Sequence, residues 1–110
     1  MTLQELFTDA SKFTKGKIAV DKNGREINPF GEAACAWDLR GGIIKCYPNT
    51  EEMLAVQVDL ANAIRQLFPD RIRYTKEKNC LPDLCVIVDF GDYSTTTFED
   101  VMAVIARSGK

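Results

Sequence analysis

The chain has 110 residues, of which 45% are hydrophobic and 27% are charged, and its formal net charge is −2 at pH 7. We expect a single globular domain over residues 1–110, because this length supplies one compact core. The acidic balance argues against broad nucleic-acid binding, which needs a basic face. No apolar run approaches the roughly 20 residues needed to cross a bilayer, so no membrane span is expected.

Histidine is absent from the sequence. Serine–histidine and cysteine–histidine nucleophile pairs are therefore excluded, as are histidine metal ligands and a histidine general base. The spacing of Cys35, Cys46, Cys80 and Cys85 lacks the two close pairs that structural zinc sites use. The N-terminus has early acidic residues and no apolar signal core. We therefore expect a cytoplasmic protein with four reduced, metal-free cysteines and no cofactor.

The first predicted element is a helix over residues 3–13. Thr2 followed by Glu5 has the form of a capping box, in which each residue satisfies a backbone N–H of the other. Apolar residues then recur at helical spacing as far as Phe13. One face of this helix is expected to be buried.

A short β-hairpin is predicted next, with strands Lys17–Asp21 and Arg25–Asn28. Apolar and polar residues alternate in the first strand. Asn23-Gly24 is a strong signal for a tight turn, because both residues tolerate positive φ. Pro29 ends the second strand. The tip of this hairpin is expected to be exposed.

Residues 31–48 contain Gly41-Gly42 and allow two interpretations. We favour a buried helix that runs through both glycines, which would let another backbone approach closely, near Ala61 and Ile64 of the next helix. The alternative is a break at the glycines followed by a strand. Pro48 ends the segment in either case.

The strongest helix signal starts at Asn49 or Thr50, with acidic residues in its first turn, and ends at Pro69-Asp70. One stripe of this helix is predicted to be buried, namely Met53, Val56, Leu60, Ile64 and Leu67, widened by Leu54, Ala61 and Phe68. Alternation over residues 71–75 then predicts an edge strand. A continuous apolar run over residues 84–90 predicts a buried strand.

A final helix is predicted to begin after Thr97, which suits the N-cap position with Asp100 at N3, and to end before Gly109. Thr96 with Glu99 offers an alternative register for its start. The sum of these elements is an α+β fold. Three to four helices pack with a short β-hairpin and one or two further strands.

An acidic stretch precedes the final helix and begins Asp89-Phe90-Gly91, followed by Asp92. In protein kinases such a triplet holds magnesium, but only beside a glycine-rich loop, a strand lysine and a catalytic loop, none of which this sequence contains. We interpret the stretch as the passage from a strand to the last helix. Asp89 and Asp92 are the residues that a small metal-dependent enzyme would use, and magnesium would need further ligands.

Three motifs together resemble a family of small bacterial and phage proteins classed as a domain of unknown function. They are the segment FTKGKIAVDKNGREINP from Phe13 to Pro29, the segment ACAWDLRGGI with Cys35, Trp37, Gly41, Gly42 and Ile43, and TFEDV with Thr97, Asp100 and Val101. The resemblance covers both ends and the first third of the chain. It implies no activity, and it supports a helix through the two glycines.

These features favour a non-catalytic protein-interaction or accessory module with an unknown protein partner, and they leave a homodimer open. The candidate contact residues are Trp37 and the hairpin tip with Lys22, Asn23 and Arg25. An alternative is weak nucleic-acid binding through the segment Arg71–Lys78, in which Arg71, Arg73 and Tyr74 combine positive charge with one stacking ring. The same charges also suit a solvated edge strand.

Overall fold

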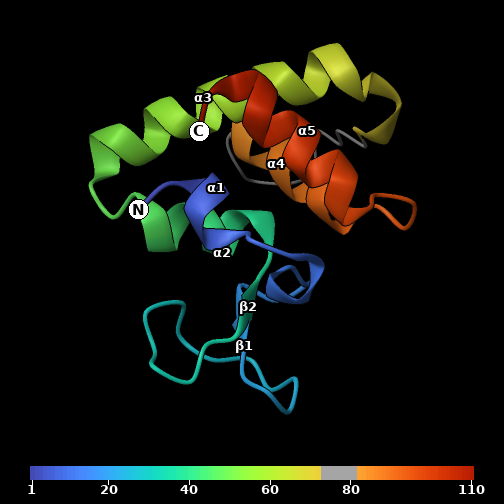
Figure 1. The fold of residues 1–110 in the computed structure, drawn as a ribbon. Helices are drawn as coiled ribbons and strands as arrows, with labels where there is room; N and C mark the ends of the chain where they lie inside the picture. Colours follow the sequence, from blue (N-terminus) through green and yellow to red (C-terminus); the bar gives the residue numbers. More distant parts are fainter. Residues whose placement is uncertain (73–81) are drawn as a thin grey trace.

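The computed structural model describes residues 1–72 and 82–110. Its elements in chain order are α1 (Leu3–Leu6), the 3-10 helix η1 (Ala10–Lys12), β1 (Ala19–Val20), β2 (Ala36–Trp37), α2 (Leu39–Cys46), α3 (Thr50–Leu67), the 3-10 helix η2 (Pro69–Arg71), α4 (Pro82–Asp92) and α5 (Phe98–Ser108). Figure 1 shows α3, α4 and α5 packed together at one end, α1 and α2 beside them, and the two short strands at the opposite end. The predicted α+β class is confirmed.

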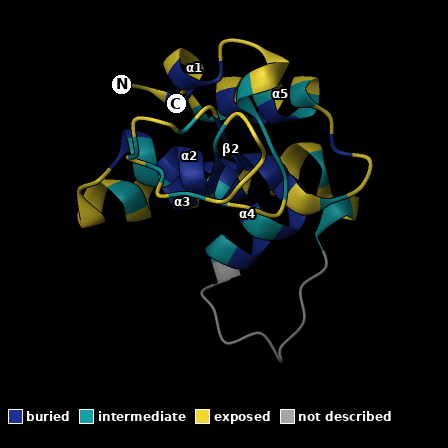
Figure 2. Cartoon of the chain, turned by 90° about the horizontal axis from the view of Figure 1, so that it is seen from below, coloured by how far each residue is buried: buried dark blue, intermediate teal, exposed yellow. Residues whose placement is uncertain are grey.

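One hydrophobic core lies between the helices, and Figure 2 shows the buried residues on their facing sides. The largest fully buried side chains come from all five α-helices and from the residue that follows α1: Phe7, Phe90, Leu3, Leu39, Ile43, Leu60, Ile64, Ile87, Ile105, Val56, Val101 and Val104. The two ends of the chain meet beside this core. The backbone N–H of Leu3 donates to the carbonyl of Lys110 at 3.1 Å, so α1 is held against the end of α5.

The N-terminal helix is shorter than predicted. The capping box is present, because the Glu5 N–H donates to the Thr2 hydroxyl at 3.2 Å and the Thr2 N–H donates to the Glu5 carboxylate at 3.0 Å. However, α1 ends at Leu6, and a separate 3-10 helix begins at Ala10. Its cap is Asp9, whose carboxylate accepts from the Ser11 N–H at 2.9 Å. Aspartate competes with helical bonding in this way, and that ends the predicted helix early.

The predicted hairpin has its turn but not its strand partner. Gly24 has φ +78, and its N–H donates to the Asp21 carbonyl at 3.0 Å, so the tight turn is confirmed. β1 pairs antiparallel with β2, whereas residues 25–28 reach β1 through a single bridge from Glu26 to Val20 and adjoining backbone hydrogen bonds. The physical reason is burial: both residues of β2 are buried, whereas residues 25–28 are mostly exposed.

The helical interpretation of Gly41-Gly42 is confirmed, because both glycines lie within α2. The helix begins later than predicted, after Asp38, whose carboxylate accepts from the Gly41 N–H at 2.6 Å. Trp37 therefore lies in β2 rather than in a helix. Aspartate at the N-cap fixes this start, since its side chain satisfies an N–H that has no helical partner.

The close neighbour of the two glycines differs from the expected one. A Cβ built on Gly41 would lie 1.7 Å from the carbonyl oxygen of Ile18, and one built on Gly42 would lie 2.7 Å from the Phe7 ring. The backbone of α2 is thus pressed against the segment before β1 and against the residue that follows α1. The expected approach of α3 near Ala61 and Ile64 is wrong.

The helix α3 begins and ends as predicted. The Asn49 side chain accepts from the Glu52 N–H at 3.1 Å, and the acidic first turn suits the positive end of the helix dipole. The inner stripe is buried at Val56, Leu60, Ala61 and Ile64. Leu54 and Leu67 were predicted to belong to it, but their side chains are 44% and 41% exposed.

The predicted strand over residues 84–90 is wrong, because these residues form most of α4. A continuous apolar run fits a helix that is buried on most sides as well as it fits a buried strand. Here Cys85, Val86, Ile87 and Phe90 are all buried in a helix that packs against α2 and α3. Of the predicted edge strand, Arg71 belongs to η2, and residues 73–75 lie outside the described residues.

The last helix is confirmed at both ends. Asp100 donates its N–H to the Thr97 hydroxyl at 3.2 Å, and its carboxylate accepts from the Thr97 N–H at 3.1 Å. Gly109 adopts the left-handed conformation that ends the helix, with φ +76.

Thr97→Ala is expected to lower the free energy of unfolding by about 1 kcal/mol, because it removes the acceptor of the capping box. Urea denaturation of both proteins measures this difference. Thr95→Ala is the control, since Thr95 is exposed in the same loop and is not the cap. Equal denaturation midpoints for Thr97→Ala and the wild type would contradict the predicted role of the hydroxyl.

Candidate functional site

The outward side of α3 carries exposed apolar side chains. Leu54 and Val58 are each 44% exposed and stand one helical turn apart, so they lie on the same side of the helix. Ala55 between them is exposed as well. Val58 lies about 160° around the helix axis from the buried Leu60, whereas Leu54 lies at the border of the buried face, about 20° from Ala61. We call the exposed residues Leu54, Ala55 and Val58 the α3 apolar patch.

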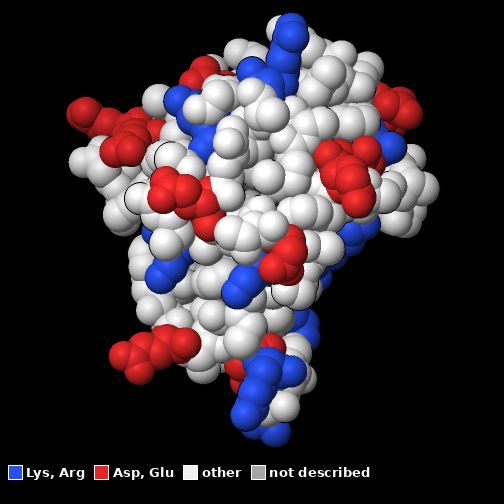
Figure 3. Space-filling model, in the orientation of Figure 1, with Lys and Arg blue, Asp and Glu red and all other residues white. Residues whose placement is uncertain are grey.

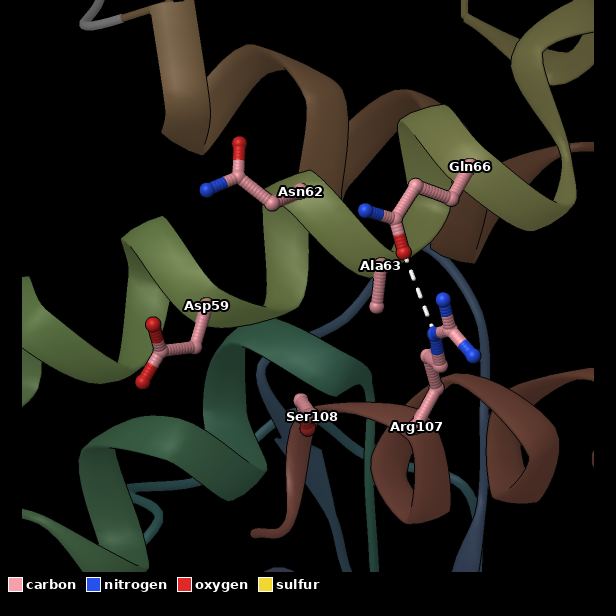
Figure 4. A pocket seen from close by; sticks show the side chains of 6 residues that line it. All are labelled: Asp59, Asn62, Ala63, Gln66, Arg107 and Ser108. Atoms are coloured by element: carbon pink, nitrogen blue, oxygen red, sulfur yellow. Dashed lines mark hydrogen bonds between the residues drawn. The ribbon is translucent and has the colours of Figure 1, made fainter.

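A polar hollow of about 270 Å³ lies beside this patch, between α3 and the end of α5 (Figure 4). It is lined by Asp59, Asn62, Ala63, Gln66, Arg107 and Ser108. Gln66 and Arg107 point toward each other across it, and the Arg107 Nε donates to the Gln66 side-chain oxygen at 3.1 Å.

The charges at the hollow have partners within the chain. Asp59 forms an ion pair with Lys110, with 3.1 Å between the two charged atoms. Arg107 is engaged by Gln66. The lining offers hydrogen-bond donors and acceptors on an open surface, which suits recognition of a polar surface at the edge of the α3 apolar patch.

The predicted hairpin tip is exposed at the end of the molecule away from α3 (Figure 1). Asp21 orders it, because its carboxylate accepts from the N–H groups of Asn23 at 2.8 Å and of Arg25 at 3.0 Å. The bond from the Arg25 N–H holds the pKa of Asp21 below its ordinary value. Lys17 donates to the Gly24 carbonyl at 3.0 Å. Lys22, Asn23 and Arg25 are thus presented on an ordered turn.

Trp37 lies in the core. Its side chain is only 7% exposed, and its indole N–H donates to the Pro29 carbonyl at 3.0 Å. The ring therefore belongs to the core and holds the loop that ends at β2. The sequence left core packing open as the alternative for Trp37, and the structure shows this core packing.

Arg71 serves the fold. Its guanidinium pairs with the Asp100 carboxylate and lies over the Phe68 ring, 4.5 Å from the ring centroid. Burial acts to raise the pKa of Asp100. The hydrogen bonds from the Thr97 N–H and the Arg71 guanidinium outweigh this effect, so the pKa of Asp100 lies below its ordinary value. Arg73 and Tyr74, the other residues of the proposed nucleic-acid segment, lie outside the described residues.

Figure 3 shows acidic and basic side chains interspersed over the visible face, with basic side chains gathered at the end that carries the hairpin tip. This mixture differs from the continuous basic surface that tracks a nucleic-acid backbone.

The acidic pair Asp89 and Asp92 lies on α4, and the predicted acidic loop is therefore helical. Asp89 is buried, whereas Asp92 is exposed and accepts from the Gly16 N–H at 2.9 Å. Lys15 donates to the Tyr93 carbonyl at 2.7 Å, where a cation favours the negative end of the helix. Lys15 and Gly16 thus anchor the N-terminal loop to the end of α4. No group of three or more metal-ligating side chains occurs among the described residues.

The cysteines differ in state. Cys35 and Cys46 are free, and burial raises the pKa of the Cys46 thiol to about 11, so it stays protonated near neutral pH. Cys85 is disulfide-bonded. The prediction that all four cysteines are reduced is therefore wrong at Cys85.

Asp38 is a buried carboxyl at the start of α2. Burial raises its pKa above the ordinary value of 3.8, against the lowering effects of the Gly41 N–H and Arg40, and Asp92 and Glu26 add to the rise. A raised pKa means that the folded protein binds this proton more tightly than the unfolded chain does. The free energy of unfolding is therefore expected to fall as pH rises from the ordinary value through the raised one.

Asp38→Asn is expected to remove this dependence, because asparagine keeps the cap acceptor without the charge. Urea denaturation of the variant and the wild type at about pH 4 and at about pH 7 is the measurement, with the range set by ordinary aspartate titration. The variant should gain stability relative to the wild type as pH rises. If the difference in free energy of unfolding between Asp38→Asn and the wild type were the same at both pH values, burial of the Asp38 charge would not destabilise the fold.

The α3 apolar patch is the part of the site that the sequence analysis missed. Leu54 is predicted to widen the buried stripe together with Ala61, from which it is separated by only about 20° around the helix axis, yet it is 44% exposed. The available signal was Val58, an apolar residue that the helical spacing places about 160° from Leu60 and one turn after Leu54.

Comparisons with models of protein families, with curated proteins and with solved structures each found no match to this chain. The resemblance to a family of bacterial and phage proteins therefore stays a prediction. Among the described residues, no helix has both the length and the apolar character needed to cross a membrane.

Proposed function

We propose that this chain is a non-catalytic protein-interaction module, accessory in role, that binds a protein partner through the outward side of α3. The observation that carries the proposal is the α3 apolar patch, in which Leu54 and Val58 are each 44% exposed on one side of the helix. The polar hollow beside it supplies hydrogen-bonding groups at the edge. An apolar centre with a polar rim is the usual composition of a protein interface.

The alternatives receive less support. An enzyme that uses Asp89 and Asp92 would need both carboxylates at one metal, but Asp92 binds the Gly16 N–H and Asp89 is buried. A nucleic-acid binder would use Arg71, which is engaged by Asp100 and Phe68.

The origin and location are proposals of the same kind. We propose a bacterial or phage protein of the family that the three motifs resemble, acting in the cytoplasm. The free cysteines Cys35 and Cys46 agree with a reducing compartment. The disulfide at Cys85 counts against it, since stable disulfides are rare in the cytosol.

Site-specific photo-cross-linking tests the proposed function. A benzophenone amino acid placed at Val58 is expected to cross-link to a discrete protein in the native host. The same amino acid placed at Ala103, an exposed position on α5, is the control and should give no such product. Equal products at both positions, or none at Val58, would refute binding through the outward side of α3.

A further inference from the structure

We propose that the partner is a second copy of this chain, and that two copies of α3 pair antiparallel about a two-fold axis at Val58. This inference rests on the proposed function, because it identifies the partner of the same α3 surface. It follows from the way in which charged residues are placed around the apolar patch.

The charges on the outward side of α3 are self-complementary only in the antiparallel sense. Glu51 and Arg65 stand seven residues before and after Val58. Seven residues make about two helical turns, so all three lie on one side of the helix. A two-fold axis at Val58 places Glu51 of each copy opposite Arg65 of the other. In a parallel pair, Glu51 would face Glu51 and Arg65 would face Arg65, which is repulsive.

The apolar patch occupies the centre of this arrangement. Val58 lies at the axis, and Leu54 lies one turn from it, between Val58 and Glu51, where it faces the exposed Asn62 of the other copy. Ala55 is small and lets the two helices approach. Asp59 follows the axis, so that position 57 of the other copy is opposite it, and its charge is balanced within the chain by Lys110 at 3.1 Å.

The Arg65 guanidinium has N–H donors that can bind a carboxylate of the other copy. Its guanidinium is paired with Asp83 at 3.0 Å and donates to the Asn62 side chain at 3.1 Å, while the Arg65 side chain remains 40% exposed. Arginine has five N–H donors, so donors remain for a carboxylate of the other copy. Glu51 forms no ion pair or side-chain hydrogen bond within residues 1–72 and 82–110, and it is exposed.

Sedimentation equilibrium over a wide concentration range tests the dimer. The average mass of the wild type is expected to rise with concentration from 12.3 kDa, the mass of one chain, toward twice that value. Val58→Arg should stay at the mass of one chain, because it places a charge at the axis. Ala103→Arg makes the same charge change on exposed α5 and should dimerise like the wild type.

A charge exchange tests the antiparallel geometry. Glu51→Arg and Arg65→Glu should each raise the dimer dissociation constant about tenfold or more, because each places two like-charged pairs in its own dimer. A mixture of the two variants should recover pairing, since arginine then meets glutamate at both ends. Glu52→Arg is the control for Glu51→Arg, because both remove a negative charge from the positive end of the α3 dipole. Residue 52 lies on a different side of the helix, so this variant should dimerise like the wild type.

The outcomes separate this inference from the proposed function. A wild type that keeps the mass of one chain at all concentrations overturns the dimer. If the photo-cross-linker at Val58 then captures a different protein, the proposed function still stands, and if it captures nothing, both fail. A wild-type dimer whose two charge variants do not recover pairing on mixing overturns the antiparallel arrangement.

Discussion

Gly41→Ala is expected to lower the free energy of unfolding by about 3 kcal/mol or more, the upper end of the effect of overpacking. The added Cβ would lie 1.7 Å from the carbonyl oxygen of Ile18, well inside any permitted contact. That oxygen belongs to the backbone, so relief requires movement of α2 or of the chain before β1. Urea denaturation, or failure to obtain folded protein by circular dichroism, measures the effect.

Two other glycines calibrate this result. Gly91→Ala lies in a helix and meets only the Leu39 Cβ at 3.6 Å, an ordinary contact, so it should gain about 0.4–1 kcal/mol through the unfolded chain. Gly42→Ala would meet the Phe7 ring at 2.7 Å, a side chain that can shift, so its cost should be smaller than that of Gly41→Ala. A denaturation midpoint for Gly41→Ala equal to that of the wild type would contradict the close approach of Ile18.

Phe90→Ala is expected to lower the free energy of unfolding by about 3–5 kcal/mol, the range for removal of a buried phenylalanine. The Phe90 side chain is fully buried and stacks on Phe68, with ring centroids 5.3 Å apart. Its removal leaves a cavity where α4 meets the end of α3. The measurement is the change in the free energy of unfolding from urea titration.

Phe30→Ala is the matched control for this substitution. Phe30 is half exposed and contacts Lys45 only through a cation–π arrangement at 5.8 Å. Its loss should change stability by no more than about 0.5 kcal/mol. If Phe90→Ala were as mild as Phe30→Ala, the inward orientation of α4 would be wrong.

The starts of α1, α3 and α5 and the end of α5 could be predicted from the sequence because the signals that set them are local. Thr2 with Glu5, Asn49, and Thr97 with Asp100 each satisfy backbone N–H groups within three residues, and Gly109 supplies the left-handed residue that ends α5. These interactions depend little on the rest of the fold. The turn at Gly24 was predictable for the same reason.

The early end of α1 and the late start of α2 are set by the local caps Asp9 and Asp38, whereas the other incorrect predictions depended on distant residues. The run over residues 84–90 is apolar on nearly every side because α4 packs against both α2 and α3, and such burial removes the periodicity that marks a helix. The strand partner of Ala19 comes from Trp37 rather than from the neighbouring turn. The exposure of Leu54 likewise depends on which elements pack against α3. The α3 apolar patch therefore could not be predicted from the sequence and is seen only in the tertiary structure.

The contact between Leu3 and Lys110 has a consequence for the topology of the chain. The N–H of Leu3 and the carbonyl of Lys110 are 3.1 Å apart, so a short flexible linker can join the two positions without disturbing the core. New ends opened at the exposed turn 22–24, on the opposite side of the molecule, would then give a circularly permuted protein with the same packing. The same turn is also the place where a reporter domain can be inserted while the outward side of α3 remains clear.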